Sequence, residues 1–261
     1  MTYISDFKSA PFALFGVNGG QTSTDTSLAT LVGVRFSSDD GRQFVLVQNG
    51  ATALASGVLV QGPATIGANH IGLAVAAAAA TGATTITATL GGTATTVNQY
   101  AGGYVAVSAA QGIGQTLGIS SNTATGTSGV VTLTLEDPLS LNLTTSSKVT
   151  LTLPAYGSAN GTAITTHGVI IAPSGTSTGQ LIGETFYPIA ASSSTLATYG
   201  FIQSKGPVAA LAAGTATAGL GCMLGAVNGA VSTQVATANA QIGRFITTAE
   251  DAKAQLIYID L

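Results

Sequence analysis

The chain has 261 residues, of which 7% are charged, against about 25% in an average soluble domain. A formal net charge of −3 and a pI near 5.1 argue against a nucleic-acid partner, which requires a basic face. One cysteine excludes an intrachain disulfide and a cysteine-based metal site. Gly, Ala, Ser and Thr replace the charged residues, as in a β protein solvated by hydroxyls or one whose surface is buried against other subunits. Because a surface poor in charge favours association, we favour a component of an assembly.

Residues 1–30 follow neither a helical nor a strand period, and their first half is rich in aromatic side chains. The four aromatic residues there are Tyr3, Phe7, Phe12 and Phe15. A polar, disordered tail does not need such side chains. We therefore expect an extended N-terminal arm that docks them into a neighbouring subunit, with a frayed terminus as the alternative.

Residues 31–75 are expected to be β structure. Apolar runs at 32–36 and 44–48 flank Asp39-Asp-Gly41, and an Asp-Gly pair between such runs predicts a hairpin. The same acidic pair lacks the further oxygen ligands of a calcium loop, so we interpret it as a turn.

Residues 76–157 are expected to form a second, inserted β unit. In four of its runs Thr, Ser or Ala alternates with Ile, Val or Leu, which places the aliphatic side chains on one face of a strand. These runs are 84–90, 104–108, 130–135 and 148–153. The alanine run 76–80 can be one helical turn or an extended linker. The longest apolar segment, 73–80, is about half the length that spans a bilayer, so we expect no membrane partner.

Strand patterns resume after residue 158 and continue to the end of the chain. The last two, 240–246 and 254–260, flank the charged tip 250–253 and predict a closing hairpin. Its candidate core residues are Ile242, Phe245, Leu256 and Tyr258.

The fold class we expect is all-β. The motif Ala-Leu-Ala-x-Gly occurs at 53–57 and again at 210–214, which suggests that distant parts of the chain share one barrel or sandwich. We therefore assign 31–75 and 158–261 to the main unit and 76–157 to the insertion. Two consecutive domains are the alternative.

No pattern of catalytic or ligand-binding residues stands out. His70 and His167 lie almost a hundred residues apart, and a lone His such as His70 is typically a hydrogen-bonded structural residue. Cys222 lies among Gly, Met and Leu and is interpreted as a small buried hydrophobe. Glu136 and Asp137 are adjacent in an extended segment, so their side chains point to opposite faces, a poor geometry for acid–base catalysis. We expect no catalytic, cofactor or metal site and no enzymatic activity.

Several runs resemble the head decoration (cement) proteins of tailed bacteriophages. They include Leu133-Thr-Leu-Glu-Asp-Pro-Leu139 and Leu143-Thr-Thr-Ser-Ser-Lys-Val-Thr-Leu151, and the likeness covers most of the chain after about residue 34. The other runs are 82–94, 98–107, 168–173 and 199–207. The motifs are turns and strand alternations, so no functional residue carries over, and residues 1–30 depart from the pattern.

The resemblance implies a structural virion protein on the outer capsid surface. Its partners would be the major capsid protein and copies of itself, as a trimer, and it would stabilise the shell by bridging neighbouring capsid subunits. A β-rich receptor- or glycan-binding module of a tail fibre or surface layer is the second hypothesis. An aromatic loop cluster or calcium-binding Asp groups would favour that module, and the sequence shows neither. A hydrolase on a β scaffold is the least supported.

Overall fold

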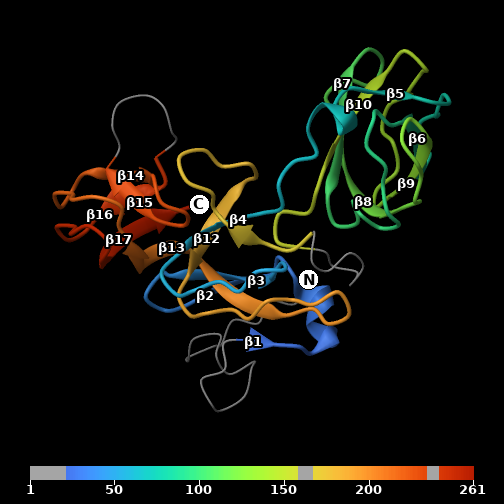
Figure 1. The fold of residues 1–261 in the computed structure, drawn as a ribbon. Helices are drawn as coiled ribbons and strands as arrows, with labels where there is room; N and C mark the ends of the chain where they lie inside the picture. The colour runs from blue at the N-terminus through green and yellow to red at the C-terminus, as the bar shows by residue number, and fades with distance from the viewer. Residues whose placement is uncertain (1–21, 158–166, 234–240) are drawn as a thin grey trace. The chain divides into compact units, whose positions relative to one another are not determined.

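The computed structural model describes residues 22–157, 167–233 and 241–261, and these are nearly all β (Figure 1). Within these ranges the helical elements are two short 3₁₀ helices, η2 (Thr26–Leu31) and η3 (Gly67–His70). The all-β prediction is confirmed. The expected arm residues Tyr3, Phe7, Phe12 and Phe15 lie outside the described residues.

The chain divides into two compact units, one inserted in the other. The described residues of the first unit are 22–64, 155–157, 167–233 and 241–261, and those of the second are 65–154. The second unit therefore begins before residue 76, where the sequence analysis placed its start. The reason is that Leu73 and Val75 are buried in the core of the second unit and their strand pairs with two others there.

The second unit is a closed six-stranded barrel. Its strands are β5 (Leu73–Val75), β6 (Thr85–Thr89), β7 (Tyr104–Ala109), β8 (Thr116–Asn122), β9 (Val130–Leu135) and β10 (Lys148–Thr152). They pair in the order β10-β5-β6-β9-β8-β7, and β7 returns to β10 to close the barrel. The expected alternation holds from Val131 in β9 and throughout β10, because Thr faces outward while the side chains between point inward. The inward residues are Val131, Leu133, Leu135, Val149 and Leu151.

Two segments of this barrel could not be assigned from local patterns alone. Residues 116–122 form β8, although Gly118 and the Ser-Ser-Asn run look like turn formers, because pairing with β7 and β9 satisfies their backbone. The alanine run 76–80 is extended rather than helical. Ala79 exchanges two backbone hydrogen bonds with Leu143, at 3.0 and 2.7 Å.

The first unit contains a larger sheet built from both ends of the chain. Its N-terminal strands are β1 (Thr22–Ser23), β2 (Arg35–Ser37), β3 (Gln43–Gln48) and β4 (Leu59–Gln61). Its C-terminal strands are β11 (Ile170–Ile171), β12 (Leu181–Thr185), β13 (Tyr199–Leu211), β14 (Gly221–Leu224), β15 (Val231–Thr233), β16 (Gly243–Phe245) and β17 (Ala254–Asp260). The path β11-β4-β12-β13-β17-β16-β14-β15 curls into a half-barrel, and β2 and β3 extend from β13.

The long strand β13 connects the parts of this sheet. Its first half pairs with β3 and β12, and its second half pairs with β17. Ile202 packs with the apolar residues of β3 and β4, whereas Val208 and Ala210 enter the half-barrel core. The change occurs at Gly206, whose φ of +100° suits glycine and where an added Cβ would lie 2.8 Å from Cγ of Arg42.

The repeated Ala-Leu-Ala-x-Gly motifs lie side by side in the first unit. The backbone N–H of Leu211 donates to the carbonyl of Gly57 at 2.7 Å. The expected hairpins are also present, with β2 antiparallel to β3 and β16 antiparallel to β17.

Candidate contact surface and buried acid

The last strand, β17, presents large apolar side chains to solvent. Leu256 and Tyr258 are 39% and 41% exposed, whereas Ile257 and Ile259 are fully buried in the half-barrel core. The prediction that Leu256 and Tyr258 belong to the core is therefore wrong. When successive residues of a strand are apolar, either face of the strand can be the buried one. In β17, pairing with β13 and β16 buries the face that carries the two isoleucines. The core prediction for Ile242 and Phe245 is confirmed.

We call the exposed side of β13, β16 and β17 the outer face. Its residues are Lys205, Pro207, Ala209, Arg244, Leu256, Tyr258 and Asp260. Register places Tyr258 opposite both Pro207 and Arg244, and Leu256 opposite Ala209. Directly paired residues share one side of a sheet, so the apolar side chains form a continuous band.

An ion pair lies at one end of the outer face, and Arg244 lies beside Tyr258. Lys205 Nζ lies 3.2 Å from Asp260 Oδ1, and both side chains are well exposed. An exposed ion pair contributes little to folding stability. At the same end lies a hollow of about 410 Å³ lined by Gln241, Ile242, Gly243, Arg244, Tyr258 and Asp260. The outer face thus joins an apolar band to a polar hollow.

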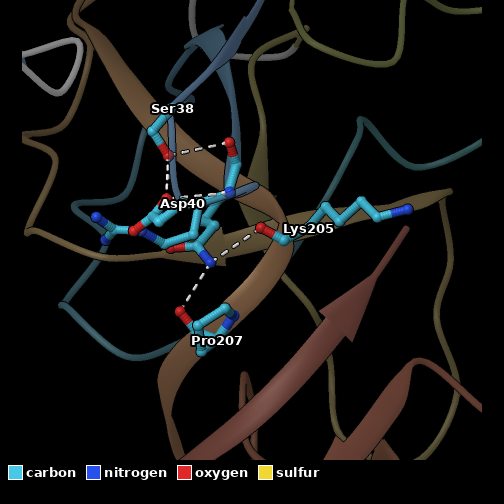
Figure 2. A network of polar contacts seen from close by, with 6 residues as sticks. Ser38, Asp40, Lys205 and Pro207 are labelled. Carbon is cyan, nitrogen blue, oxygen red and sulfur yellow. Dashed lines mark hydrogen bonds and ion pairs between the residues drawn. The ribbon is translucent and has the colours of Figure 1, made fainter. Parts of the chain in front are cut away.

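A polar network lies where β13 bends, beside the turn that joins β2 and β3 (Figure 2). Asp40 accepts hydrogen bonds from Ser38 Oγ and from the side-chain Nε of Arg42, the latter at 2.7 Å. The amide of Gln203 donates to the carbonyl oxygens of Lys205 and Pro207, at 3.0 and 2.9 Å. These bonds hold a turn and a bend, so the turn interpretation of residues 39–41 is confirmed.

Glu184 is a carboxyl group buried in the half-barrel. It is 0% exposed, and neither of its oxygens has a hydrogen-bond partner among the described residues. Burial raises the pKa of Glu184 to about 8, since the charged form loses its water. Sequence analysis missed this residue; its one signal is an acidic side chain among the apolar and small residues of β12.

Cys222 lies in the same core and is fully buried, as predicted. Its pKa is raised to about 12 by burial and, secondarily, by the nearby charge of Glu184. A thiol with so high a pKa is a poor nucleophile at neutral pH.

His70 is a buried structural residue, as predicted. Its Nδ1 is hydrogen-bonded to the hydroxyl of Tyr100, and its Nε2 lies 2.9 Å from the carbonyl oxygen of Thr93. Burial raises the pKa of Tyr100. Both ring nitrogens are thus engaged within the barrel. His70 lies in the second unit and His167 in the first.

In the described part of the chain, no group of three or more His, Cys, Asp or Glu side chains is placed to hold a metal ion. Nor does any helix there have both the length and the apolar character to cross a bilayer. Comparisons with protein-family models, with curated proteins and with solved structures find no match. Fold and surface therefore define the class of the chain: an all-β protein with an inserted barrel and an apolar outer face.

Proposed function

We propose that the chain is a structural virion protein that decorates the capsid of a tailed bacteriophage and stabilises it by bridging neighbouring major capsid subunits. The observation that carries the proposal is the outer face, where Leu256 and Tyr258 lie exposed in an apolar band rather than in the core. The resemblance of the strand and turn motifs to head decoration proteins supplies the identity of the partner.

The composition supports the same proposal. With 7% charged residues, the chain has few ionic side chains to keep its surfaces apart from those of other proteins. In a decorated shell every copy repeats the same modest contacts, and contacts repeated within one assembly reinforce each other without any single one being strong. A trimer, as the resemblance implies, would multiply the contacts of each decorating unit.

The direct test is binding of the purified chain to empty, expanded heads of its own phage, measured by co-sedimentation. The proposal predicts saturation at a copy number set by the capsid lattice. Tyr258→Lys should weaken this binding, because it places a charge in the apolar band. Failure to sediment with the heads at any concentration would contradict the proposal.

A second candidate function is a glycan-binding module, which the hollow at the end of the outer face favours. The aromatic ring of Tyr258 can stack on a sugar ring, while Arg244, Gln241 and Asp260 offer donors and acceptors for hydroxyl groups. Binding to host cells that free sugars abolish, without binding to heads, would favour this second function.

A further inference from the structure

Glu184 lies on the inward side of the half-barrel. It pairs directly with Leu59 of β4 on one side and with Gln203 of β13 on the other. Directly paired residues of antiparallel strands share one side of the sheet. Leu59 belongs to the same apolar core as Cys222, whose pKa responds to the charge of Glu184. The carboxyl therefore points into the core that the half-barrel encloses.

No cation compensates this carboxyl among the described residues. Besides β12, the strands that contribute to this core are β4, β13, β14, β15, β16 and β17. Their buried polar side chains are neutral, namely the amides of Gln61 and Gln203, the hydroxyl of Ser204 and the thiol of Cys222. The charged residues of these strands, Lys205, Arg244 and Asp260, belong to the outer face. An unpaired carboxylate at this place would be a charge without water or counterion, which is strongly unfavourable.

The amide oxygen of Gln203 gives the protonation state of Glu184 a second effect on the stability of the half-barrel. Its Nε2 is engaged by two backbone carbonyls, while its Oε1 is buried without a hydrogen-bond donor in the described structure. A neutral carboxyl carries a hydroxyl that can donate, whereas an ionised carboxylate can only accept. Protonated Glu184 thus offers the missing donor from the directly opposite position, and ionised Glu184 sets a negative charge beside an unpaired acceptor.

We infer that Glu184 is a proton-dependent lock of the half-barrel: the strands β4, β12 and β13 are held together while the carboxyl is neutral, and its ionisation loosens them. The lock belongs to the fold of the first unit and acts whichever partner the chain binds.

The direction of the pH dependence of stability follows from the difference in the pKa of Glu184 between the folded and the unfolded chain. The pKa of Glu184 is about 8 in the folded chain, above the ordinary glutamate value of 4.5, so between these pH values the folded state holds a proton that the unfolded state has lost. Stability therefore falls as the pH rises through this window, and it levels off above pH 8. The difference of 3.5 pH units corresponds to a loss of roughly a thousand-fold or more in the folding equilibrium constant.

The chain is well suited to a direct measurement because it contains three glutamates, Glu136, Glu184 and Glu250. The side chains of the other two are exposed. With ¹³C placed at the side-chain carboxyl carbon of glutamate in the full-length protein, the lock predicts that one NMR signal stays at the protonated position at pH 6 and titrates near pH 8. A Glu184 signal that ionises near pH 4, as in a solvated glutamate, would overturn the inference.

Glu184→Gln assigns the signal by removing it, and the amide keeps a donor for Gln203 without a charge. If that variant does not fold, Glu136→Gln and Glu250→Gln assign the remaining signal by elimination. Urea unfolding of the wild type should give a lower midpoint at pH 9 than at pH 5. In E184Q the fall in the urea midpoint between pH 5 and pH 9 that Glu184 causes should disappear, whereas E136Q should still show it. Parallel pH profiles for the wild type and E184Q would also refute the lock.

Discussion

Arg244 and Tyr258 are direct partners across β16 and β17, and both side chains lie on the exposed side of the sheet. Tyr258 is at the same time opposite Pro207 on β13, so three strands contribute to one row. The apolar band continues to Leu256, two residues along β17 and opposite Ala209. A surface assembled from three strands is rigid, and a rigid surface loses little conformational entropy when it binds.

The first prediction concerns neighbouring residues of β17 that face opposite ways. Leu256→Ala should change the free energy of unfolding by less than about 1 kcal/mol, because its side chain is already partly solvated. Ile257→Ala should cost about 2–5 kcal/mol, because it leaves a cavity in the half-barrel core. Urea unfolding measures both.

Binding to phage heads should rank the same two positions in the opposite order. At temperatures where both variants are folded, L256A should bind roughly ten-fold more weakly, and I257A should bind like the wild type. Equal binding by L256A and the wild type would remove Leu256 from the contact surface.

The second prediction tests the barrel of the second unit through its glycines. A Cβ added at Gly103 would lie 2.1 Å from the carbonyl oxygen of Thr152, whereas one at Gly126 would meet no atom within 4 Å. Gly103→Ala should therefore destabilise the barrel by about 1–3 kcal/mol, since the backbone must shift. Gly126→Ala, the matched control, should be neutral or slightly stabilising, because it restricts the unfolded chain. Thermal unfolding of both variants is the measurement, and equal melting temperatures would contradict the packing described for Gly103.

The third prediction uses the single thiol. Because Cys222 is fully buried and its pKa is raised to about 12, it should react with a thiol reagent at pH 8 at least about a hundred-fold more slowly than in the unfolded chain. The rate should follow the opening of the half-barrel and rise on addition of urea. Rapid labelling of the native protein would show that the thiol is accessible.

The fourth prediction concerns the N-terminal residues that lie outside the described structure. Deletion of residues 1–20 removes Tyr3, Phe7, Phe12 and Phe15. The truncated chain should keep the unfolding midpoint of the full-length protein and bind heads more weakly. Unchanged head binding would eliminate the arm hypothesis, and a lower unfolding midpoint would assign these residues to the fold instead.

Much of the fold could be predicted from the sequence because period-two alternation is a local signal. The strand 130–135 has the predicted bounds, and its inward Leu133 and Leu135 follow from the pattern. The hairpin across Asp39–Gly41 follows from turn chemistry in the same way. Strand β8 could not be predicted, because its pairing partners, not its own residues, hold it extended.

The surface and the buried acid were harder to predict, for two different reasons. Along β17 apolar residues are successive, so the pattern fixes a strand but leaves its buried side to the neighbouring strands. Glu184 is the one charged residue of β12, and its neighbours in sequence give no sign of its surroundings. The fold brings Leu59, Gln203 and Cys222 around it. Contacts between residues on different strands, 19 to 125 positions apart here, leave no mark in a local pattern.

The central claim is that the chain binds a capsid through its outer face, and an image reconstruction of the phage particle tests it most directly. The proposal predicts density for both units on the outside of the shell, repeated with the lattice, with Leu256 and Tyr258 against a capsid subunit or another copy of the chain. A reconstruction of the complete virion without this density on its shell, or with the outer face turned to solvent, would contradict the account.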